Sequence, residues 1–545
     1  MLQLEGYPLE VLLTAANSAA QAWYGYEQVS PVRDGECVHR SLQLLQGIIA
    51  GLLVSDRFLN TFPQLHTPSI EGIFTSSFAL GNLVGCLMVA IFGDWLGRRR
   101  TLWVGSGISA TGAILQFAAT SFPQLMVGRV INGLGNGMTS STCGVYQAES
   151  CRGPRRGKLS VIVVTHNVVF YMLGSWLTLG TWYINNDAQW RLPFALQLVP
   201  AIVLCTLLFG LPESPRWLLL HDRHEEALEA LRRYLGSGLT HDDEAVQREY
   251  KSIVSSIEIE RRSKITFKEV MLCRDRSGHL KRMLLGMGTQ FMQKQMTGIN
   301  ALNYYFSIIL INNLGFSELL ARVLTGANAT SYCISTASAF FIIERRGRRF
   351  LMMTGLWLQA FAYIMVALAV GMLARAPQQW GAVAISFLFF YYAAFGCTWG
   401  MVPWIYQAEV NSLAMRTRGA AAATSMNWLF GFVCTQFTSV GIRNLGYKFY
   451  IIFAVLNFAF LPVVYFLYPE TANRTLEDLN DYFDRDSPHK TIIAIGDKVA
   501  KQHHRPQEAI DSEHRRIAMA DESETVYTKK AGDDAQWVEQ SSNSV

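Results

Sequence analysis

Residues 290–305 read QFMQKQMTGINALNYY and lie inside a long apolar segment. The stretch nevertheless carries a cation, a hydroxyl and several amides near a glycine that weakens a helix, among them Lys294, Thr297, Gln295, Asn300, Asn303 and Gly298. Hydrocarbon offers no hydrogen bonds, so a membrane segment this polar must face a wet cavity or a ligand. We therefore treat the stretch as a candidate substrate site.

The composition is that of a protein that crosses the membrane many times. Half of the 545 residues are hydrophobic and only 16% are charged, and the mean hydropathy is positive, which a soluble chain of this size does not normally show. Apolar runs of about 20 residues predict transmembrane helices. A first span is predicted to begin near Pro8, and eleven more follow at 71–92, 101–120, 122–146, 159–183, 192–210, 282–311, 318–343, 349–373, 379–407, 418–440 and 447–467.

The placement of charge predicts the orientation of these spans. Basic residues cluster after the even-numbered spans, at 98–100, 152–158, 219–281, 345–349 and 416–418. Because Lys and Arg accumulate in cytoplasmic loops, we expect both termini in the cytoplasm. The first residues lack the basic region and cleavage site of a signal peptide, so we expect the first span to be retained as an anchor. The nine cysteines are scattered and predict neither a disulfide framework nor a metal site.

A polar block, VSPVRDGECVHRSLQLLQ at 29–46, interrupts the first span. Each of its charged residues would cost about 2.5–3.5 kcal/mol at a helix centre. Removing the block joins Glu27-Gln28 to Gly47-Ile48 and restores one apolar helix. Its first residues, Val-Ser, and its last, Gln, are compatible with the ends of an intron, so we hypothesise a retained intron that is translated in frame. The alternative is a genuine polar excursion after a short span at 8–28.

Several short motifs occur twice at a near-constant offset. GDWLGRRR (93–100) resembles ERRGRRF (344–350), and YQAE occurs at 146–149 and 406–409, 260 residues apart. PESPR (212–216) and PETANR (469–474) end the sixth and twelfth spans. Such repeats predict two homologous six-helix halves.

These landmarks divide the chain into four predicted regions. We expect an N-terminal bundle at 1–218, an amphipathic cytoplasmic linker at 219–281, a C-terminal bundle at 282–470 and a largely disordered cytoplasmic tail at 471–545. The predicted fold is therefore an all-α polytopic membrane protein of twelve transmembrane helices in two pseudo-symmetric bundles.

From about residue 8 to 480 the chain resembles the sugar porter family of the major facilitator superfamily, of the fungal hexose/proton symporter type. The motifs that carry the resemblance are GYEQ (25–28), GDWLGRRR, GRVINGLGNG (128–137), YQAES, QWRLPFALQ (189–197), PESPRWL, KQMTGINALNYY, ERRGRR, TWGMVPWIYQAE (398–409), NW (427–428) and PETANRTLEDL (469–479). The glycines of GLGNG are interpreted as helix-packing residues and not as a nucleotide loop.

The resemblance implies a central cavity that opens alternately to each side of the membrane. A sugar needs amide donors and acceptors together with an aromatic face for its C–H side. In the family, the positions of Gln295, Asn300, Trp404 and Asn427 line the sugar pocket, and those of Tyr304 and Tyr305 help to close its outer gate. The alternative for the aromatic residues is ordinary packing between helices.

A carboxylic acid and an arginine inside the first half are expected to pair. Glu27 and Arg129 would each be costly unpaired in the membrane, so we expect them to face one another. Proton-coupled members of the family carry an acid at the position of Glu27, and the resemblance therefore implies symport. The alternative is a static ion pair.

Further charges recur with the repeat at the predicted cytoplasmic helix ends: Arg98, Glu149, Arg156, Glu344, Arg348, Glu409 and Arg416. We interpret them as a latch between the bundles that forms in the outward-facing state. Exposed pairs contribute only about 0–1 kcal/mol each, but several together bias two nearly isoenergetic states. The alternative is ordinary positive-inside charge with incidental acids.

The chain departs from the family at some positions of the site. Lys294 replaces a glutamine, and an ammonium donates hydrogen bonds but cannot accept them. Buried at a sugar site, it would need a carboxylate, lose its proton or favour an anionic substrate such as a sugar acid. Tyr332 stands where an asparagine is expected, which removes one amide from the site.

We therefore expect proton-coupled import of a monosaccharide, hexose or pentose, across the plasma membrane. The alternatives are facilitated transport of a sugar, polyol or sugar acid, and a non-transporting sugar sensor. An enzyme is not expected, because the sequence shows no metal-ligand spacing, nucleophile elbow or phosphate loop. The expected partners are the sugar, the proton and the lipid bilayer, with no cofactor and no nucleic acid, and the chain is expected to act as a monomer.

Overall fold

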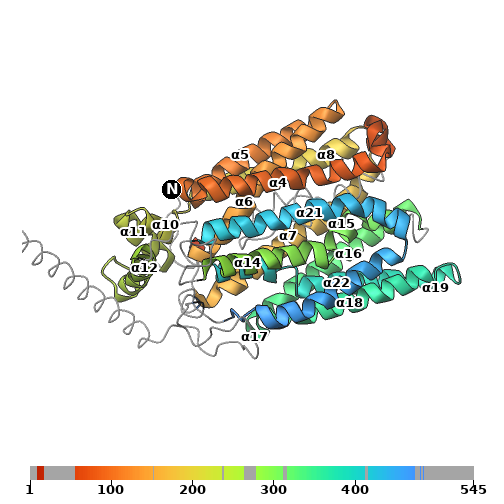
Figure 1. The fold of residues 1–545 in the computed structure, drawn as a ribbon. Helices are drawn as coiled ribbons and strands as arrows, with labels where there is room; N and C mark the ends of the chain where they lie inside the picture. Colours follow the sequence, from red (N-terminus) through yellow and green to blue (C-terminus); the bar gives the residue numbers. More distant parts are fainter. Residues whose placement is uncertain are drawn as a thin grey trace, which may run out of the picture.

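The structure is a computed structural model that describes residues 9–10, 12–17, 56–150, 153–235, 239–262, 278–310, 316–411, 415–472, 479 and 483. Their regular structure is entirely helical. Figure 1 shows long helices that run side by side, with a group of short helices at one end of the bundle. The predicted all-α class is thus confirmed.

The first half of the chain contributes α3 (Asp56–Thr61), the 3₁₀ turn η1 (Pro63–His66), α4 (Pro68–Leu96), α5 (Arg98–Phe117), α6 (Phe122–Ser150), α7 (Gly153–Trp182), α8 (Ala188–Leu196) and α9 (Leu198–Leu208). The short helices that follow are α10 (Pro215–Leu220), α11 (His224–Leu235) and α12 (Glu244–Arg262). The second half contributes α14 (His279–Phe291), η2 (Met292–Met296), α15 (Ile299–Ile308), α16 (Glu318–Ser338), η4 (Ala339–Phe341), α17 (Ile343–Arg346), α18 (Arg348–Gly371), α19 (Pro377–Cys397), α20 (Val402–Val410), α21 (Arg416–Leu445) and α22 (Lys448–Leu467).

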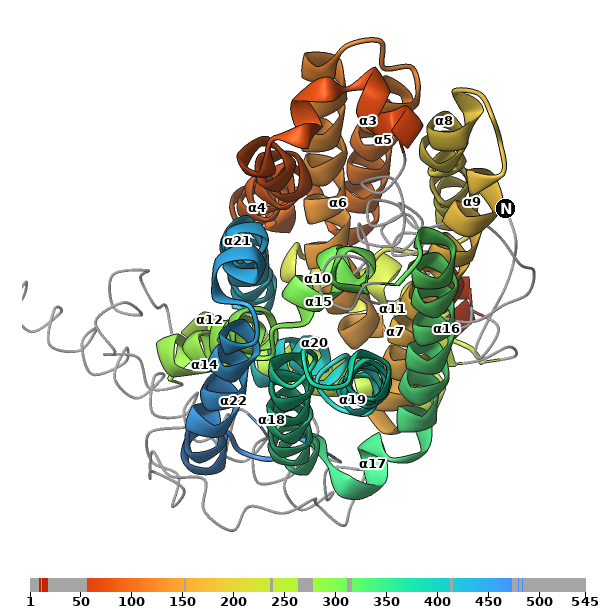
Figure 2. The ribbon, with the colours of Figure 1, turned by 90° about the vertical axis from the view of Figure 1, so that its right-hand side faces the viewer.

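The two halves form separate groups of helices. Figure 2 shows α3 to α6, α8 and α9 on one side and most of α14 to α22 on the other, with α7 reaching in beside α16 and α19. The groups meet mainly where α4 packs against α21 and where α7 packs against α16. The polar block 29–46 and most of the tail lie outside the described residues, so the predicted division at 218, 281 and 470 stays a prediction.

The helices differ in hydropathy according to their place in the bundle. Among the described residues, five segments are long and apolar enough to cross a membrane by length and composition: Gly72–Leu96, Ala188–Leu208, Arg348–Gly371, Pro377–Val410 and Lys448–Leu467. The helix α6 is more polar but is buried along most of its length, including Asn132 and Asn136. Polar residues are tolerated there because α4 and α5 shield them from lipid.

The glycines of α6 bring three helix backbones into contact. A Cβ at Gly137 would lie 2.2 Å from the carbonyl oxygen of Asn82 on α4, and one at Gly135 would lie 2.3 Å from that of Gly105 on α5. Such close approach is typical of membrane helices, where small residues replace the missing hydrophobic force. The interpretation of this run as a packing motif agrees with these contacts.

The short helices form a small core of their own at one end of the bundle. Trp217 and Leu218 of α10 pack with Ala227 and Leu231 of α11 and Ile253 of α12. The apolar faces of α11 and α12 are therefore covered by each other and by α10, and their charged faces point outward.

The close contact at Gly137 gives a testable prediction. We expect Gly137→Ala to destabilise the protein by about 1–3 kcal/mol, because the added methyl group overlaps the Asn82 carbonyl. The matched control is Gly107→Ala on α5, where a Cβ meets nothing within 4 Å. Thermal denaturation of the purified protein in detergent measures the difference, and equal midpoints for the two variants would contradict the packing described here.

Candidate functional site

The polar stretch that opens the second half breaks its helix. The α-helix α14 passes into a π-helical turn at η2, and Gly298 then takes a left-handed backbone conformation, with φ of 71°, before α15 begins. A Cβ at Gly298 would lie 2.5 Å from the Tyr363 hydroxyl and 2.7 Å from the Phe453 ring. Glycine is thus required both by conformation and by space. Single π-turns inside helices occur frequently at functional sites.

The break frees the carbonyl oxygen of Thr297 from the helix ladder. Two tyrosine hydroxyls from neighbouring helices donate to it, Tyr363 of α18 at 2.9 Å and Tyr391 of α19 at 2.6 Å. A buried carbonyl without a donor would be costly in the membrane. The two tyrosines therefore stabilise the broken conformation of this helix.

A chain of amides joins α14 and η2 to α20 and α21. The Asn427 amide donates to Gln290 Oε1 and, at 2.9 Å, to Gln293 Oε1. Gln290 donates to Gln407 Oε1 at 2.8 Å. Gln293 donates to the Trp399 carbonyl at 2.7 Å, where α19 has ended and α20 has not yet begun. All four amide side chains are buried.

Lys294 lies in the π-turn and is fully buried. Its ammonium donates to Asn300 Oδ1 at 3.0 Å, and the Asn300 amide donates to the Gly431 carbonyl at 3.4 Å. Gly431 is one helical turn beyond Asn427 on α21. The helix α21 therefore contacts the broken helix on both sides of the break, and the Lys294 ammonium and several buried amides gather in one region.

Of the other predicted sugar-site residues, only Trp404 has a side chain that the structure describes. Trp404 is buried on α20, one turn before Gln407. The side chains of Gln295, Tyr304 and Tyr305 lie outside what the structure describes, although their backbone belongs to η2 and α15. Gln290, Gln293 and the two tyrosines on Thr297 were not predicted. The sequence carries a signal for the two glutamines, because two amides three residues apart in an apolar segment lie on one face of a helix.

Tyr332 belongs to an aromatic cluster between the halves. Its ring lies edge-on to Tyr171 of α7 at 6.1 Å between centroids and to Tyr392 of α19 at 5.7 Å. Tyr332 is buried. It thus fills space where α7 of the first half meets α16 of the second.

Arg129 is buried near the start of α6. Its guanidinium donates to the Phe74 carbonyl at 3.0 Å, to Ser77 Oγ at 3.2 Å and to the Thr75 carbonyl at 3.4 Å, and it lies 4.4 Å from the centre of the Phe74 ring. Glu27, its predicted partner, lies outside the described residues.

The charges at the start of α5 form a network within the first half. Arg98 makes two hydrogen bonds of 2.9 Å to the Glu149 carboxylate at the end of α6. Ser214 Oγ donates to the same carboxylate at 2.6 Å. Glu213 accepts from the backbone N–H groups of Arg98 and Arg99 at 3.0 and 3.2 Å and so caps α5.

The second half repeats this network with its own residues. Arg348 donates to Glu409 at 2.9 Å, and Thr471 Oγ1 donates to the same carboxylate at 2.7 Å. Glu470 accepts from the backbone N–H groups of Arg348 and Arg349 at 2.8 and 3.0 Å. The repeated sequence motifs thus build the same structure twice.

The two halves also meet at this end through these charges, and Arg416 of α21 interacts electrostatically with Glu149 of α6. Arg98 Nη2 donates to Thr417 Oγ1 of α21 at 2.7 Å, and Arg418 lies 3.5 Å from Asp94 of α4. Arg416 is buried at the start of α21. The side chains of Arg156 and Glu344 lie outside what the structure describes.

The two tyrosines on the Thr297 carbonyl give a double-mutant test. Tyr363→Phe and Tyr391→Phe each remove one donor and are expected to cost about 0.5–1.5 kcal/mol, because the other donor remains. The double variant leaves the carbonyl without either donor, so its loss should exceed the sum of the single losses. Thermal denaturation measures this, with Tyr183→Phe at an exposed position as control. Strictly additive losses would contradict a shared acceptor.

Comparison with known proteins agrees with this architecture. Residues 44–483 match the family model "Sugar (and other) transporter". The chain is 36% identical to the MFS-type transporter oryC of Aspergillus oryzae, over 87% of this chain and 88% of that protein. It is 32% identical to the sugar transporter STL1 of Saccharomyces cerevisiae, over 88% and 82%.

A solved structure shares the fold. The proton:xylose symporter XylE bound to 6-bromo-6-deoxy-D-glucose superposes with a TM-score of 0.72 at 22% identity, over 88% of this chain and 99% of that one. The fold agrees with the match to the family model. It has a broken helix with buried amides, and the same Arg–Glu network at the helix ends of both halves. The chain belongs to the sugar transporter family of the major facilitator superfamily.

Proposed function

We propose that the chain imports a monosaccharide together with a proton by alternating access. The observation that carries the proposal is the set of buried amides and one ammonium around the broken helix, from Gln290 to Asn300, with Asn427 on α21. Amides both donate and accept, so they suit a neutral ligand that is dense in hydroxyl groups. The printed names of STL1, a sugar transporter, and XylE, a proton:xylose symporter, support the same substrate class.

Within this proposal the sugar binds between the halves. Gln295, Asn300, Asn427 and Lys294 supply hydrogen bonds, and Trp404 supplies an apolar face for the ring. Tyr304 and Tyr305 close the site from the outside. The protein acts as a monomer in the plasma membrane, with both termini in the cytoplasm.

The network at the start of α5 then lies on the cytoplasmic side. The bond from Arg98 to Thr417 joins the halves there, and the Arg98–Glu149 pair holds the guanidinium in place for it. Opening this side requires loss of that bond and of the exposed Asp94–Arg418 pair.

Proton coupling is assigned to Glu27 and Arg129. Arg129 reaches carbonyl groups of α4, and a carboxylate beside it would compete for the same donors. Protonation of Glu27 would release Arg129 to those carbonyls and change which arrangement of the halves is favoured.

Lys294 favours a second candidate substrate, a sugar acid. A buried ammonium beside Asn300 would pair with a substrate carboxylate and discriminate against neutral sugars. Uptake of hexoses, pentoses, polyols and sugar acids into cells that lack their own transporters tests both candidates, and it separates either of them from a sensor, which takes up none.

Lys294→Gln is the first variant to measure in this panel. If the substrate is a sugar acid, we expect its uptake to fall at least about tenfold, because a charged hydrogen bond is lost. If the substrate is a neutral sugar, uptake should persist, since glutamine still donates to Asn300. Lys281→Gln, outside the broken segment, is the control. Loss of neutral-sugar and sugar-acid uptake alike, with normal protein at the cell surface, would show that neither assignment describes Lys294.

Glu27→Gln tests proton coupling. A neutral side chain cannot exchange a proton, so we expect accumulation driven by an acidic exterior to be abolished while equilibrative exchange of the sugar remains. Uptake is compared at external pH 5 and pH 7, each with and without residues 29–46. Undiminished accumulation in Glu27→Gln would refute the assignment, and failure of both wild-type forms to transport would refute the proposed function.

A further inference from the structure

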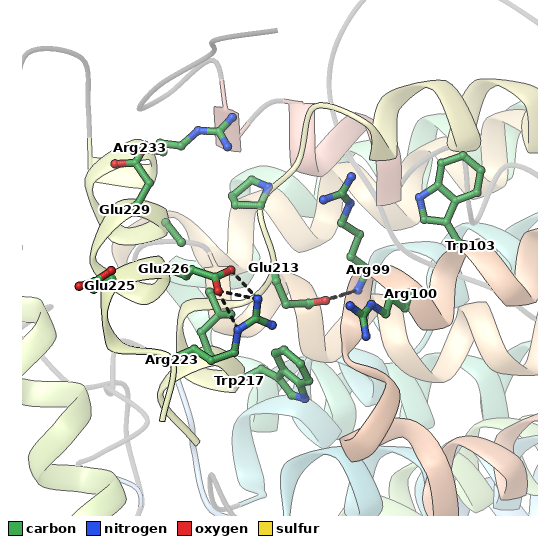
Figure 3. A pocket seen from close by; sticks show the side chains of 13 residues that line it. Arg99, Arg100, Trp103, Glu213, Trp217, Arg223, Glu225, Glu226, Glu229 and Arg233 are labelled. Carbon is green, nitrogen blue, oxygen red and sulfur yellow. Dashed lines mark hydrogen bonds and ion pairs between the residues drawn. The ribbon is translucent and has the colours of Figure 1, made fainter. Parts of the chain in front are cut away.

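A cavity of about 650 Å³ lies apart from the proposed sugar site, between the start of α5, the turn after α9 and the helices α10 and α11 (Figure 3). Its lining combines arginines, glutamates and two tryptophans: Arg99, Arg100, Trp103, Glu213, Trp217, Arg223, Glu225, Glu226, Glu229 and Arg233, with Pro212, Leu218 and Ala230. Some of these charges are neutralised by partners within the protein.

Most of the glutamates have partners within the protein. Glu226 is held by Arg223 through hydrogen bonds of 2.7 and 2.8 Å. Glu229 accepts two hydrogen bonds from Arg232, at 2.8 and 2.9 Å, and these lower its pKa to about 2. The carboxylate of Glu213 is directed at the backbone N–H groups that begin α5. Only Glu225, which is exposed, has no such partner among the described residues.

The arginines of the cavity have fewer hydrogen-bond and ion-pair partners than its glutamates. Arg99 and Arg100 make no side-chain hydrogen bond or ion pair within the part of the chain that the structure describes. Arg233 donates with one nitrogen to the Gly210 carbonyl at 3.1 Å and keeps its other donors. The cavity lining therefore has three guanidinium groups with free donors and one carboxylate, that of Glu225, without a described partner.

The second half shows that this arrangement does not follow from the repeat. Arg349 occupies the position that corresponds to Arg99, but it lies 5.0 Å from the centre of the Tyr465 ring and donates to the Tyr465 carbonyl. Phe350 stands at the position of Arg100. The cationic lining is thus particular to the first half.

One edge of the cavity carries an exposed aromatic surface. Trp103 packs edge-on against Phe209, with 4.8 Å between ring centroids, and Phe209 is 62% exposed. Tryptophan is enriched at the level of lipid headgroups. This aromatic edge therefore suits contact with a lipid surface beside the arginines.

We propose that this cavity binds a phosphate monoester through Arg99, Arg100 and Arg233. A phosphate dianion accepts several charge-assisted hydrogen bonds, and guanidinium groups match its geometry. Basic pockets at the cytoplasmic ends of membrane helices bind phosphorylated lipid headgroups in this manner, and the cytoplasmic placement rests on the proposed function. A bound phosphate would tie α11 to the start of α5, one residue from Arg98.

Native mass spectrometry of the purified protein at pH 7.5 tests the proposal without any measurement of uptake. The lipid probes are phosphatidylinositol 4-phosphate, phosphatidylinositol and phosphatidylethanolamine, and the soluble probe is inositol 1,4,5-trisphosphate. We expect the monophosphate lipid to bind at least about tenfold more tightly than the other two lipids. Arg99→Gln with Arg100→Gln should weaken that binding about tenfold or more, and Arg345→Gln with Arg346→Gln, an exposed pair in the second half, should not.

The remaining outcomes are decisive in one direction or the other. Binding of the lipid alone identifies a headgroup as the source of the phosphate, and binding of the soluble probe as well identifies an organic phosphate of either source. Equal binding of all three lipids, stronger binding of phosphatidylethanolamine, or equal loss in both arginine pairs would overturn the proposal. Because the assay contains no sugar, its result is independent of whether the chain transports one.

Discussion

Two buried arginine–glutamate pairs hold the helix ends of this protein in register. Arg98 with Glu149, and Arg348 with Glu409, each join the start of one membrane helix to the end of another. Charges this deeply buried are stable only when geometry and further hydrogen bonds compensate for lost hydration. The hydroxyls of Ser214 and Thr471 complete the two sites. Loss of either partner would leave an uncompensated charge, so both halves depend on these pairs.

The same constraint explains the break in the helix that carries the proposed sugar site. A membrane helix normally satisfies its own backbone, and a break exposes carbonyl groups that lipid cannot satisfy. Here the hydroxyls of Tyr363 and Tyr391 satisfy Thr297, and amides of α14, η2 and α21 satisfy one another. The polar groups are therefore held by the protein and remain available to a ligand that offers equivalent hydrogen bonds.

Within the first half the helices pack backbone to backbone, and the halves meet along α4 with α21 and α7 with α16. The glycines of α6 leave no room for a methyl group against α4 and α5. Across the halves the contacts include the Tyr171–Tyr332 ring pair and the bond from Arg98 to Thr417. The proposed alternating access requires that these contacts between the halves separate while those within each half persist.

The sequence by itself determined the helical class, the family resemblance and the two matched halves, because hydropathy and repeated motifs are local properties. It also marked Gly298 as a weak point of the helix, and the structure shows a left-handed backbone there. Only the tertiary structure decided that Gln290 and Gln293 meet Asn427, that Lys294 donates to Asn300, and that Arg129 reaches the carbonyls of α4. These pairings depend on how far each helix is rotated and shifted against its neighbour. Spacing along one helix cannot specify that register, because it arises from the packing of all the helices together.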